Sequence, residues 1–335
     1  MDTPTRVQVI GGGSWGLALA DLLARNGCAV RLWCRAEDDP EHLRATRQSR
    51  YYLPHFMLAP EVMVEETFDS TVDIAVFAVP SHAMRWAATE FPFAAHTLRV
   101  NVAKGIERGT LKRMSEILEE AGSGGAVATL SGPSHAEEVA QGLPASVVVA
   151  SADHEAAAVV QRVFFRDTFR VYTSADIVGV ELGGALKNVI AIAAGVCDGL
   201  GLGDNAKAAL VTRGLAEITR VAVACGGNPL TLAGLSGMGD MIVTCFSRHS
   251  RNRRLGEMIA QGHPWQEVTA STHMVAEGVS TAAAAHDLAN KAGVEMPISE
   301  AVYRVLHEGV SPGAALASLL SREAKPEQYG FAGAV

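Results

Sequence analysis

A glycine-rich turn near the start of the chain is the first feature that could bind a ligand. Gly11, Gly13 and Gly16 fill the three glycine places of a G-x-G-x-x-G pattern, after an apolar run at 6–10 and before a helical pattern near Trp15. The first glycine permits a tight turn, the second lets backbone approach a pyrophosphate, and the third lets helix and strand pack closely. Free N–H groups and the helix dipole would face that pyrophosphate, so the turn predicts a dinucleotide site.

The residue at the end of the next expected strand bears on which dinucleotide binds. NAD-selective folds usually place Asp or Glu there to bind the ribose 2′-hydroxyl. This chain has Arg35 instead, followed by Glu37, Asp38 and Asp39. A guanidinium can pair with a 2′-phosphate, although the following acids could oppose it, or Arg35 could be a solvated surface side chain. We expect NADP to bind well, with NAD as the alternative.

Lys187 is the candidate general acid/base. It lies in the segment 181–188, inside an apolar helical stretch. Gly183 lies over the same helix face, so it would leave room for a ligand beside the amine. A partly desolvated lysine has a lowered pKa, which suits proton transfer. The alternative is a lysine whose stem packs while its ammonium reaches water.

Two polar segments follow in the second half of the chain. The glycine-rich run 234–240 ends in Asp240 and predicts a loop that brings backbone close to another group. Ser250 is a good N-cap for a helix over 251–261. A phosphate could bind the free N–H groups there, with Arg251 and Asn252 adding charge and hydrogen bonds. The alternatives are a solvated basic surface or an RNA contact, which the scarcity of nearby aromatic residues disfavours.

The expected elements explain how these residues are positioned. Strands are predicted at 6–10, 29–33, 73–79, 97–102, 126–130 and 146–150, and helices at 15–26, 81–90, 110–120 and 154–164. This alternation predicts an α/β fold with a Rossmann-like doubly wound sheet in an N-terminal dinucleotide-binding domain, 1–176. Long alanine- and leucine-rich segments after that point predict an all-helical C-terminal domain, 177–335. Because this domain contains Lys187 and both polar segments, we expect it to be the substrate-binding and catalytic domain. Two domains also suit 335 residues.

Composition narrows the class of protein. The formal net charge of −8 disfavours a nucleic-acid partner. Five scattered cysteines without a CxxC pair argue against a disulfide scaffold and favour a cytoplasmic location. No uncharged apolar run is long enough for a transmembrane helix, and no separate signal peptide is visible. The eleven histidines lack H-x-x-x-H or HExxH spacing, so no metal site is expected.

With these pieces together, the sequence resembles the bacterial NAD(P)-dependent glycerol-3-phosphate dehydrogenases over nearly its whole length. The resemblance is carried by segments 11–16, 79–81, 104–107, 131–134, 181–188, 235–240, 249–252 and 276–278, in that order and spacing. It implies reversible reduction of dihydroxyacetone phosphate to sn-glycerol 3-phosphate by NADPH or NADH, supplying glycerophospholipid synthesis. It also implies a homodimer.

The resemblance assigns roles residue by residue. Lys187 is the proton donor and acceptor, and Lys104 contacts both substrate and cofactor. The implied substrate-binding residues are Lys104, Gly132, Ser134, Lys187, Asp240, Ser250, Arg251 and Asn252. The implied cofactor-binding residues are Gly11, Gly13, Ser14, Trp15, Gly16, Arg35, Lys104, Ala136, Arg251, Val275 and Glu277. Position 134 is Ser where relatives often have Thr, and both supply a hydroxyl.

Two other functions remain open at this point. Another dehydrogenase of the same architecture, of the β-hydroxyacid or 6-phosphogluconate type, would share the glycine turn and a helical-domain lysine. It is not expected to combine the 104–107 segment with the 250–252 segment. A non-enzymatic dinucleotide sensor would need the glycine turn but not Lys187, Asp240 and Asn252.

Overall fold

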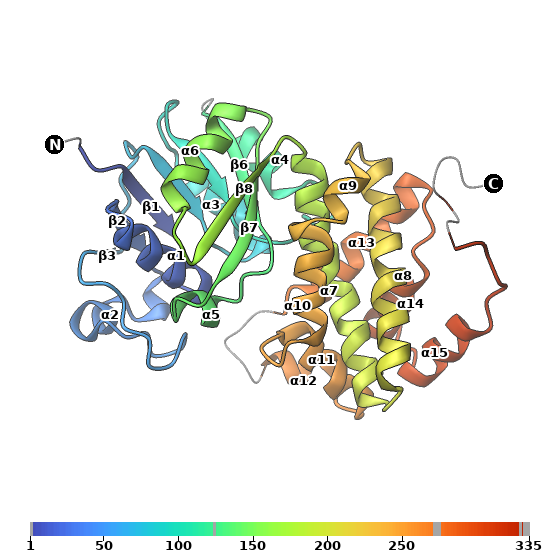
Figure 1. The fold of residues 1–335 in the computed structure, drawn as a ribbon. Helices are drawn as coiled ribbons and strands as arrows, with labels where there is room; N and C mark the ends of the chain where they lie inside the picture. The colour runs from blue at the N-terminus through green and yellow to red at the C-terminus, as the bar shows by residue number, and fades with distance from the viewer. Residues whose placement is uncertain (1–2, 123–124, 271–275, 328–329, 331–335) are drawn as a thin grey trace. The chain divides into compact units, whose positions relative to one another are not determined.

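The computed structural model describes residues 3–122, 125–270, 276–327 and 330 (Figure 1). The chain forms two compact units. Unit 1 comprises Met1–Lys104 and Lys112–Glu181, and unit 2 comprises Gly105–Leu111 and Leu182–Val335.

Unit 1 is built on an eight-stranded sheet with the order β3-β2-β1-β4-β5-β6-β7-β8. The strands are β1 (Arg6–Ile10), β2 (Ala29–Trp33), β3 (Met63–Glu65), β4 (Ile74–Phe77), β5 (Leu98–Asn101), β6 (Val127–Ser131), β7 (Ala145–Ala150) and β8 (Phe169–Ser174). Neighbouring strands from β3 to β6 are parallel, β7 runs antiparallel to β6, and β8 is parallel to β7. The strand order reverses between β1 and β4, which is where open α/β sheets bind ligands.

Helices cover both faces of this sheet. Alternate residues of its strands therefore point into two different hydrophobic cores. Ile74 and Val76 belong to one core, which also contains residues of α1 (Ser14–Arg25) and α6 (His154–Phe164). Ala75 and Phe77 belong to the other core, with residues of α3 (Met84–Glu90) and α4 (Met114–Ala121). The expected Rossmann-like doubly wound sheet is therefore confirmed.

The sequence did not predict every element of unit 1. The short edge strand β3, the strand β8 and the helices α2 (Pro40–Thr46) and α5 (Ala136–Ala140) were not expected. β3 has three residues and α5 has five, so neither is long enough to show a clear periodicity. In β8, buried Phe169 and Val171 alternate with exposed Arg170 and Tyr172.

Unit 2 carries the predicted all-helical region. Its helices are α7 (Ile177–Gly199, from residue 182 onward), α8 (Gly203–Ala224), α9 (Pro229–Leu232), the π-helical turn η3 (Leu235–Gly239), α10 (Asp240–Phe246), α11 (Arg251–Ala260), α12 (Trp265–Ala270), α13 (Gly278–Ala292), α14 (Pro297–His307) and α15 (Pro312–Leu320). The predicted all-helical C-terminal half is therefore confirmed.

The glycine-rich run before Asp240 is helical, so the prediction of a loop there is wrong. Its residues form η3, which leads directly into α10. A Cβ at Gly237 would lie 2.1 Å from the backbone oxygen of Leu232. Close backbone packing thus requires glycine at this position, and the packing allows a helical turn that intrinsic propensity disfavours.

Glycines also bring α7 and α11 into backbone contact. A Cβ at Gly195 of α7 would lie 1.8 Å from the backbone oxygen of Arg253, and one at Gly256 of α11 would lie 2.0 Å from that of Ile192. Both distances are far below van der Waals contact, so no larger residue fits without backbone movement. These contacts fix the position of α11 along α7.

Two helical stretches are apolar enough, by length and composition alone, to cross a membrane. Ile177–Gly199 has a mean hydropathy of 1.6, and 89% of its apolar window is buried inside the protein, as in a core helix. Pro229–Phe246 has a mean hydropathy of 1.2 with 39% buried. Two such stretches are weak evidence, and the described chain contains no clear transmembrane segment.

Glu217 of α8 caps the start of α14 from outside that helix. Its carboxylate accepts hydrogen bonds from the backbone N–H groups of Ile298 (2.7 Å) and Ser299 (3.1 Å) and from the Ser299 hydroxyl (3.1 Å). Burial raises the pKa of this carboxyl to about 7, although the hydrogen bonds from Ile298 and Ser299 oppose the shift.

We expect Glu217 to make the protein less stable as the pH rises from about 5 to about 8. Between the ordinary pKa of 4.5 and the folded value of about 7, the folded chain keeps a proton that the unfolded chain loses. This contribution is therefore complete below pH 4.5 and disappears as the pH passes the folded pKa. Its size is at most about 3 kcal/mol in the free energy of unfolding.

Urea unfolding at about pH 5 and at about pH 8 measures this change in the free energy of unfolding. Glu217→Gln should flatten the pH dependence of the unfolding free energy relative to the unmodified protein. Glu295→Gln is the matched control, because ion pairs lower the pKa of that exposed carboxyl and it stays ionised over the whole range. An unchanged slope in the Glu217 variant would contradict the prediction.

Candidate active site

The glycine turn lies between β1 and α1, as the sequence predicts. Gly11 has φ +117°, a conformation that disfavours other residues, and a Cβ there would lie 2.6 Å from the backbone oxygen of Ala78. A Cβ at Gly16 would lie 1.9 Å from the backbone oxygen of Gly11. These two glycines are therefore required by the fold itself, whatever the turn binds.

Gly13 differs from its neighbours, because no atom lies within 4 Å of the position that its Cβ would take. It is the N-cap of α1, where no side chain caps the helix, and the first turn contains no acidic residue. The N–H groups at this helix start are available to an anion, and the open space above Gly13 lets one approach the backbone. These features fit the pyrophosphate of a dinucleotide.

We expect Gly13→Ala to weaken cofactor binding by about tenfold or more while leaving the fold intact. The methyl group would occupy the space that the pyrophosphate needs, whereas φ −71° at this position suits alanine. Calorimetric titration with NADPH and thermal unfolding of the free protein measure the two effects. Gly16→Ala is the comparison, because its Cβ would clash with the protein and lower the melting temperature. Unchanged NADPH affinity in the Gly13 variant would refute this role.

Arg35 follows β2 and is paired with one of the acids that the sequence placed near it. Its guanidinium donates to both carboxylate oxygens of Asp38, at 2.8 and 3.2 Å. The Arg35 side chain is 54% exposed, whereas that of Asp38 is 6% exposed. Asp38 therefore holds the guanidinium at the end of β2 and leaves part of it accessible.

Three predicted substrate residues of unit 1 meet at one carbonyl group. The Lys104 ammonium donates to the backbone oxygen of Gly132 at 3.1 Å, and the Ser134 hydroxyl donates to the same oxygen at 3.2 Å. Gly132 has φ +142°, and a Cβ there would lie 2.9 Å from Cα of Val147. The turn after β6 thus brings the two side chains together.

Two predicted cofactor residues lie in helices near the glycine turn. Trp15, in the first turn of α1, packs against the core of unit 1, with its ring centroid 6.5 Å from that of Phe169. Ala136 begins α5, a helix that packs against α1. Ser14, which is also a predicted cofactor residue, is the first residue of α1.

In unit 2, Lys187 lies in the interior of α7 with its side chain 6% exposed. Its ammonium donates to Asp240 Oδ1 at 2.5 Å and to Thr244 Oγ1 at 2.6 Å. Thr244 Oγ1 in turn donates to the backbone oxygen of Asp240 at 2.6 Å. Lysine, aspartate and threonine thus form one buried cluster, in which the aspartate compensates the charge of the lysine.

The arrangement around Lys187 differs from the sequence expectation in one respect. Gly183 does not leave room for a ligand, because a Cβ there would lie 3.0 Å from the backbone oxygen of Ser236 and 3.1 Å from Leu232 Cδ1. The helical turn η3 fills this space. The alternative of a lysine whose head group reaches water is also wrong, since the side chain is buried.

Ser250 caps α11, which confirms the predicted N-cap. Its hydroxyl oxygen accepts a hydrogen bond from the backbone N–H of Arg253 at 3.2 Å. The first turn of α11 contains no acidic residue, and it presents Arg251 at an exposed position. This helix start combines N–H groups with positive charge, which suits a phosphate group.

Asn252 links three helices of unit 2. Its Nδ2 donates to Asn188 Oδ1 at 3.0 Å, and its Oδ1 accepts from the backbone N–H of Gly278 at 3.0 Å. Asn188 follows Lys187 in α7, and Gly278 begins α13 directly after Glu277, the predicted cofactor residue. Asn252 is therefore fixed beside the helix that carries Lys187.

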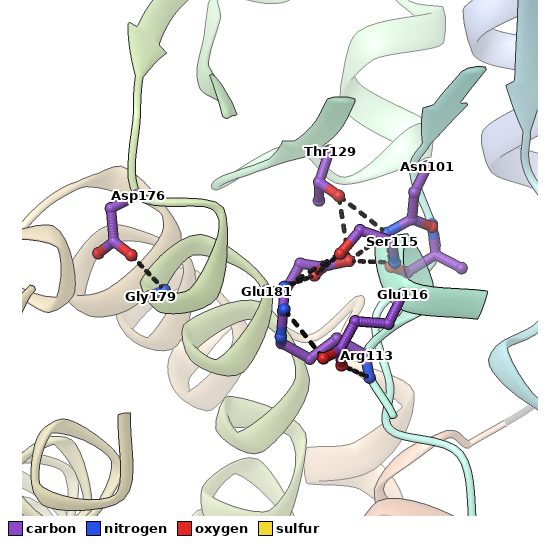
Figure 2. Close-up of polar contacts among 9 residues, drawn as sticks. Asn101, Arg113, Ser115, Glu116, Thr129, Asp176, Gly179 and Glu181 are labelled. Carbon is purple, nitrogen blue, oxygen red and sulfur yellow. Dashed lines mark hydrogen bonds and ion pairs between the residues drawn. The ribbon is translucent and has the colours of Figure 1, made fainter. Parts of the chain in front are cut away.

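Glu181 anchors the early part of α7 within unit 1 (Figure 2). Its carboxylate accepts from Arg113 Nη1 at 2.7 Å, and from the backbone N–H and the hydroxyl of Ser115 at 2.9 and 2.5 Å. Asn101 and Thr129 add hydrogen bonds at 3.2 and 3.1 Å. Burial raises the pKa of the Glu181 carboxyl, against the opposing effects of Arg113 and the hydrogen bonds.

Sequence reasoning missed two residues of this site and named one that lies outside the described residues. Thr244 contacts Lys187, and Asn188 contacts Asn252. A single threonine or asparagine, however, gives no pattern in the sequence by itself. Thr244 could have been found as the residue one helical turn after Asp240. Val275, a predicted cofactor residue, is not among the described residues.

Within the described residues, no group of three or more His, Cys, Asp or Glu side chains could hold a metal ion.

An open glycine turn at the switch point of a doubly wound sheet, in a chain that also buries a carboxylate-paired lysine, defines a class of protein. That class is the nicotinamide-dependent oxidoreductases.

Comparisons with known proteins specify the family. Models of the N-terminal and C-terminal parts of NAD-dependent glycerol-3-phosphate dehydrogenase match residues 6–157 and 176–317. The glycerol-3-phosphate dehydrogenase (NAD(P)+) of Moorella thermoacetica is 52% identical over 321 residues, covering 94% of this chain and 96% of that protein. The one from Chlorobium limicola is 50% identical over 332 residues, covering 96% and 99%.

A solved structure agrees with these sequence matches. The crystal structure of glycerol-3-phosphate dehydrogenase from Coxiella burnetii has a TM-score of 0.91 and 36% identity, over 95% of this chain and 99% of that chain. The chain belongs to the family of NAD(P)-dependent glycerol-3-phosphate dehydrogenases, as its sequence motifs predict. It is an oxidoreductase that uses NAD or NADP.

Proposed function

We propose that the protein reduces dihydroxyacetone phosphate to sn-glycerol 3-phosphate reversibly, with Lys187 as general acid/base. The observation that carries this proposal is the buried cluster of Lys187, Asp240 and Thr244, with distances of 2.5 and 2.6 Å from the ammonium. When bound, the reduced nicotinamide supplies the hydride that converts C2 of the ketone to an alcohol. Lys187 donates a proton to the carbonyl oxygen and accepts it back from the hydroxyl in the reverse direction.

Two neighbours of Lys187 position its ammonium group for this proton transfer. Asp240 compensates its charge, and Thr244 fixes the direction of its hydrogen bonds. A carboxylate repels a phosphate group, so Asp240 is not suited to bind the phosphate. It is better suited to orient Lys187 or to accept a hydrogen bond from a hydroxyl group of the substrate. We assign the phosphate to the start of α11, with Ser250, Arg251 and Asn252.

Unit 1 supplies the dinucleotide site in this proposal. Gly11, Gly13, Ser14, Trp15 and Gly16 form or follow the turn that receives the pyrophosphate. Lys104, held by the Gly132 carbonyl beside Ser134, contributes a positive charge to substrate and cofactor. We propose the division into a dinucleotide-binding domain, 1–176, and a substrate-binding and catalytic domain, 177–335, on this basis.

An absorbance assay at the nicotinamide band tests the proposal. NADPH or NADH should be oxidised when dihydroxyacetone phosphate is added, and unphosphorylated dihydroxyacetone is the matched control, which should react far more slowly. A panel of phosphorylated and unphosphorylated 2-hydroxy and 3-hydroxy substrates separates the related dehydrogenases. Binding of NADPH without any turnover of dihydroxyacetone phosphate would favour a dinucleotide sensor instead.

Arg35 is the proposed determinant of a preference for NADP. We expect Arg35→Ala to raise the KM for NADPH by roughly tenfold, because it removes a charge-assisted hydrogen bond to the 2′-phosphate. The KM for NADH, which lacks this phosphate, should change much less. Steady-state kinetics with both cofactors measures the difference. Equal changes for the two cofactors would assign Arg35 to surface structure alone.

Three further properties are proposed from the family. The product supplies glycerophospholipid synthesis, which a glycerol requirement for growth after gene deletion would test. The protein is a homodimer, which light scattering in solution would test. A cytoplasmic location agrees with the cysteines, none of which forms a disulfide in the described chain, and fractionation of cells would test it.

A further inference from the structure

Three charged side chains of unit 2 form a cluster that the proposed reaction does not use. Asp198, near the end of α7, accepts two hydrogen bonds from the Lys207 ammonium of α8, at 2.9 and 2.8 Å. The same carboxylate accepts a hydrogen bond from Nε of Arg253 in α11, at 2.5 Å. One acid therefore joins three helices.

The cluster is partly buried. The side chain of Lys207 is 8% exposed, and those of Arg253 and Asp198 are 19% and 22% exposed. The Lys207 ammonium also lies 4.7 Å from the ring centroid of Phe246, the last residue of α10. Ion pairs with this degree of burial are screened less by solvent than surface pairs, so their geometry is better defined.

Arg253 connects this cluster to the proposed phosphate site. Its backbone N–H donates to Ser250 Oγ, and its side chain is held by Asp198, so this residue is fixed at both its main chain and its side chain. The two residues between Ser250 and Arg253 are Arg251 and Asn252. The N–H groups and side chains assigned to the phosphate therefore lie on a helical turn that Asp198 anchors to α7.

We propose that Asp198 is a positioning residue for phosphate recognition, acting through Arg253 on the first turn of α11. It does not touch the substrate. It holds the turn that receives the phosphate in register with α7, which carries Lys187. The inference rests on the proposed function for the identity of the phosphate ester, whereas the binding of phosphate itself can be measured without turnover.

A purely electrostatic effect of the cluster makes a different prediction. Asp198→Asn removes a negative charge, and Arg253→Gln removes a positive charge. If the cluster acted only through its field, the first change would strengthen phosphate binding and the second would weaken it. If it positions the helix turn, both changes weaken binding, because either one breaks the link between Asp198 and α11.

The experiment measures inorganic phosphate binding by calorimetry, and KM and kcat for dihydroxyacetone phosphate, in both variants. We expect each variant to raise the dissociation constant for phosphate and the KM about tenfold, with kcat and the KM for NADPH changed less than about threefold. Asp204→Asn is the matched control, since it removes the same charge from an exposed position in α8. This control should leave the dissociation constant for phosphate, both KM values and kcat unchanged.

Three outcomes would overturn the proposal. The first is tighter phosphate binding in Asp198→Asn, which would assign the cluster an electrostatic effect. The second is a lower melting temperature with unchanged phosphate affinity and KM, which would assign it to stability alone. The third is an equal loss in Asp204→Asn. If Asp198→Asn does not fold, Arg253→Gln still decides the question, because it leaves the pair between Asp198 and Lys207 intact.

The proposed function can fail separately. If the unmodified protein does not turn over dihydroxyacetone phosphate, the reaction is wrong, while weaker phosphate binding in both variants would still support the role of Asp198.

Discussion

Replacing Lys187 with alanine is expected to lower kcat by about 10²–10⁴-fold, with NADPH affinity unchanged. The side chain that exchanges a proton with the substrate oxygen would be lost, whereas the glycine turn of unit 1 would be untouched. Stopped-flow or steady-state absorbance with dihydroxyacetone phosphate measures the rate, and calorimetry measures NADPH binding. The expected loss is among the largest of any single substitution, because the change removes the group proposed to exchange the proton itself.

A second variant separates proton transfer from folding. Lys187→Ala removes one partner of the buried ion pair with Asp240, whose side chain is 2% exposed, and breaking a buried pair typically costs about 3–5 kcal/mol. Lys187→Arg keeps a positive charge near Asp240, yet a guanidinium does not release a proton at neutral pH. Its kcat should therefore fall by a comparable factor while the melting temperature changes less. Near-normal kcat in either folded variant would remove Lys187 from the mechanism.

Gly256→Ala is expected to destabilise unit 2 strongly, although it adds only one methyl group. The new Cβ would lie 2.0 Å from the backbone oxygen of Ile192 and 3.0 Å from the backbone nitrogen of Val196. The obstacle is main chain and not the end of a flexible side chain, so α7 and α11 must separate. We expect a loss of about 3 kcal/mol or more in the free energy of unfolding, measured by urea titration. The helix shift should also raise the KM for dihydroxyacetone phosphate.

Gly313→Ala provides the matched control for this substitution. Gly313 lies in the first turn of α15, and no atom is within 4 Å of its Cβ position. Alanine there should leave stability unchanged or raise it by up to about 1 kcal/mol, since it restricts the unfolded chain. Equal losses in the two variants would show that intrinsic glycine preference, and not the contact between α7 and α11, controls stability at residue 256.

Local patterns in the sequence were sufficient to predict much of this fold. The turn from Gly11 to Gly16 follows an apolar strand and opens a helix, and its meaning depends only on neighbouring residues. The N-cap Ser250 is equally local, because capping involves groups within one helical turn. The alternation of strands and helices predicted the doubly wound sheet, while the joint order of many motifs predicted the family.

The sequence was less informative where the function of a residue depends on a distant backbone. Gly183 looked like space for a ligand, but the structure fills that space with η3. The run before Asp240 looked like a loop, because helix propensity counts only intrinsic preference and ignores close packing. The direction of β7 was also beyond reach, since strand polarity depends on how a connection folds back.

The sequence by itself determined the local elements of this protein and the candidate residues of its site. Only the tertiary structure decided which of those residues meet. Lys187 bonds to Asp240 and Thr244 from 53 and 57 residues away, and Asp198 bonds to Arg253 from 55 residues away. The physical reason is that helix and turn formation depend on neighbours along the chain. An ion pair depends instead on where two helices pack, and for Asp198 and Arg253 the bare backbone at Gly195 and Gly256 sets that position.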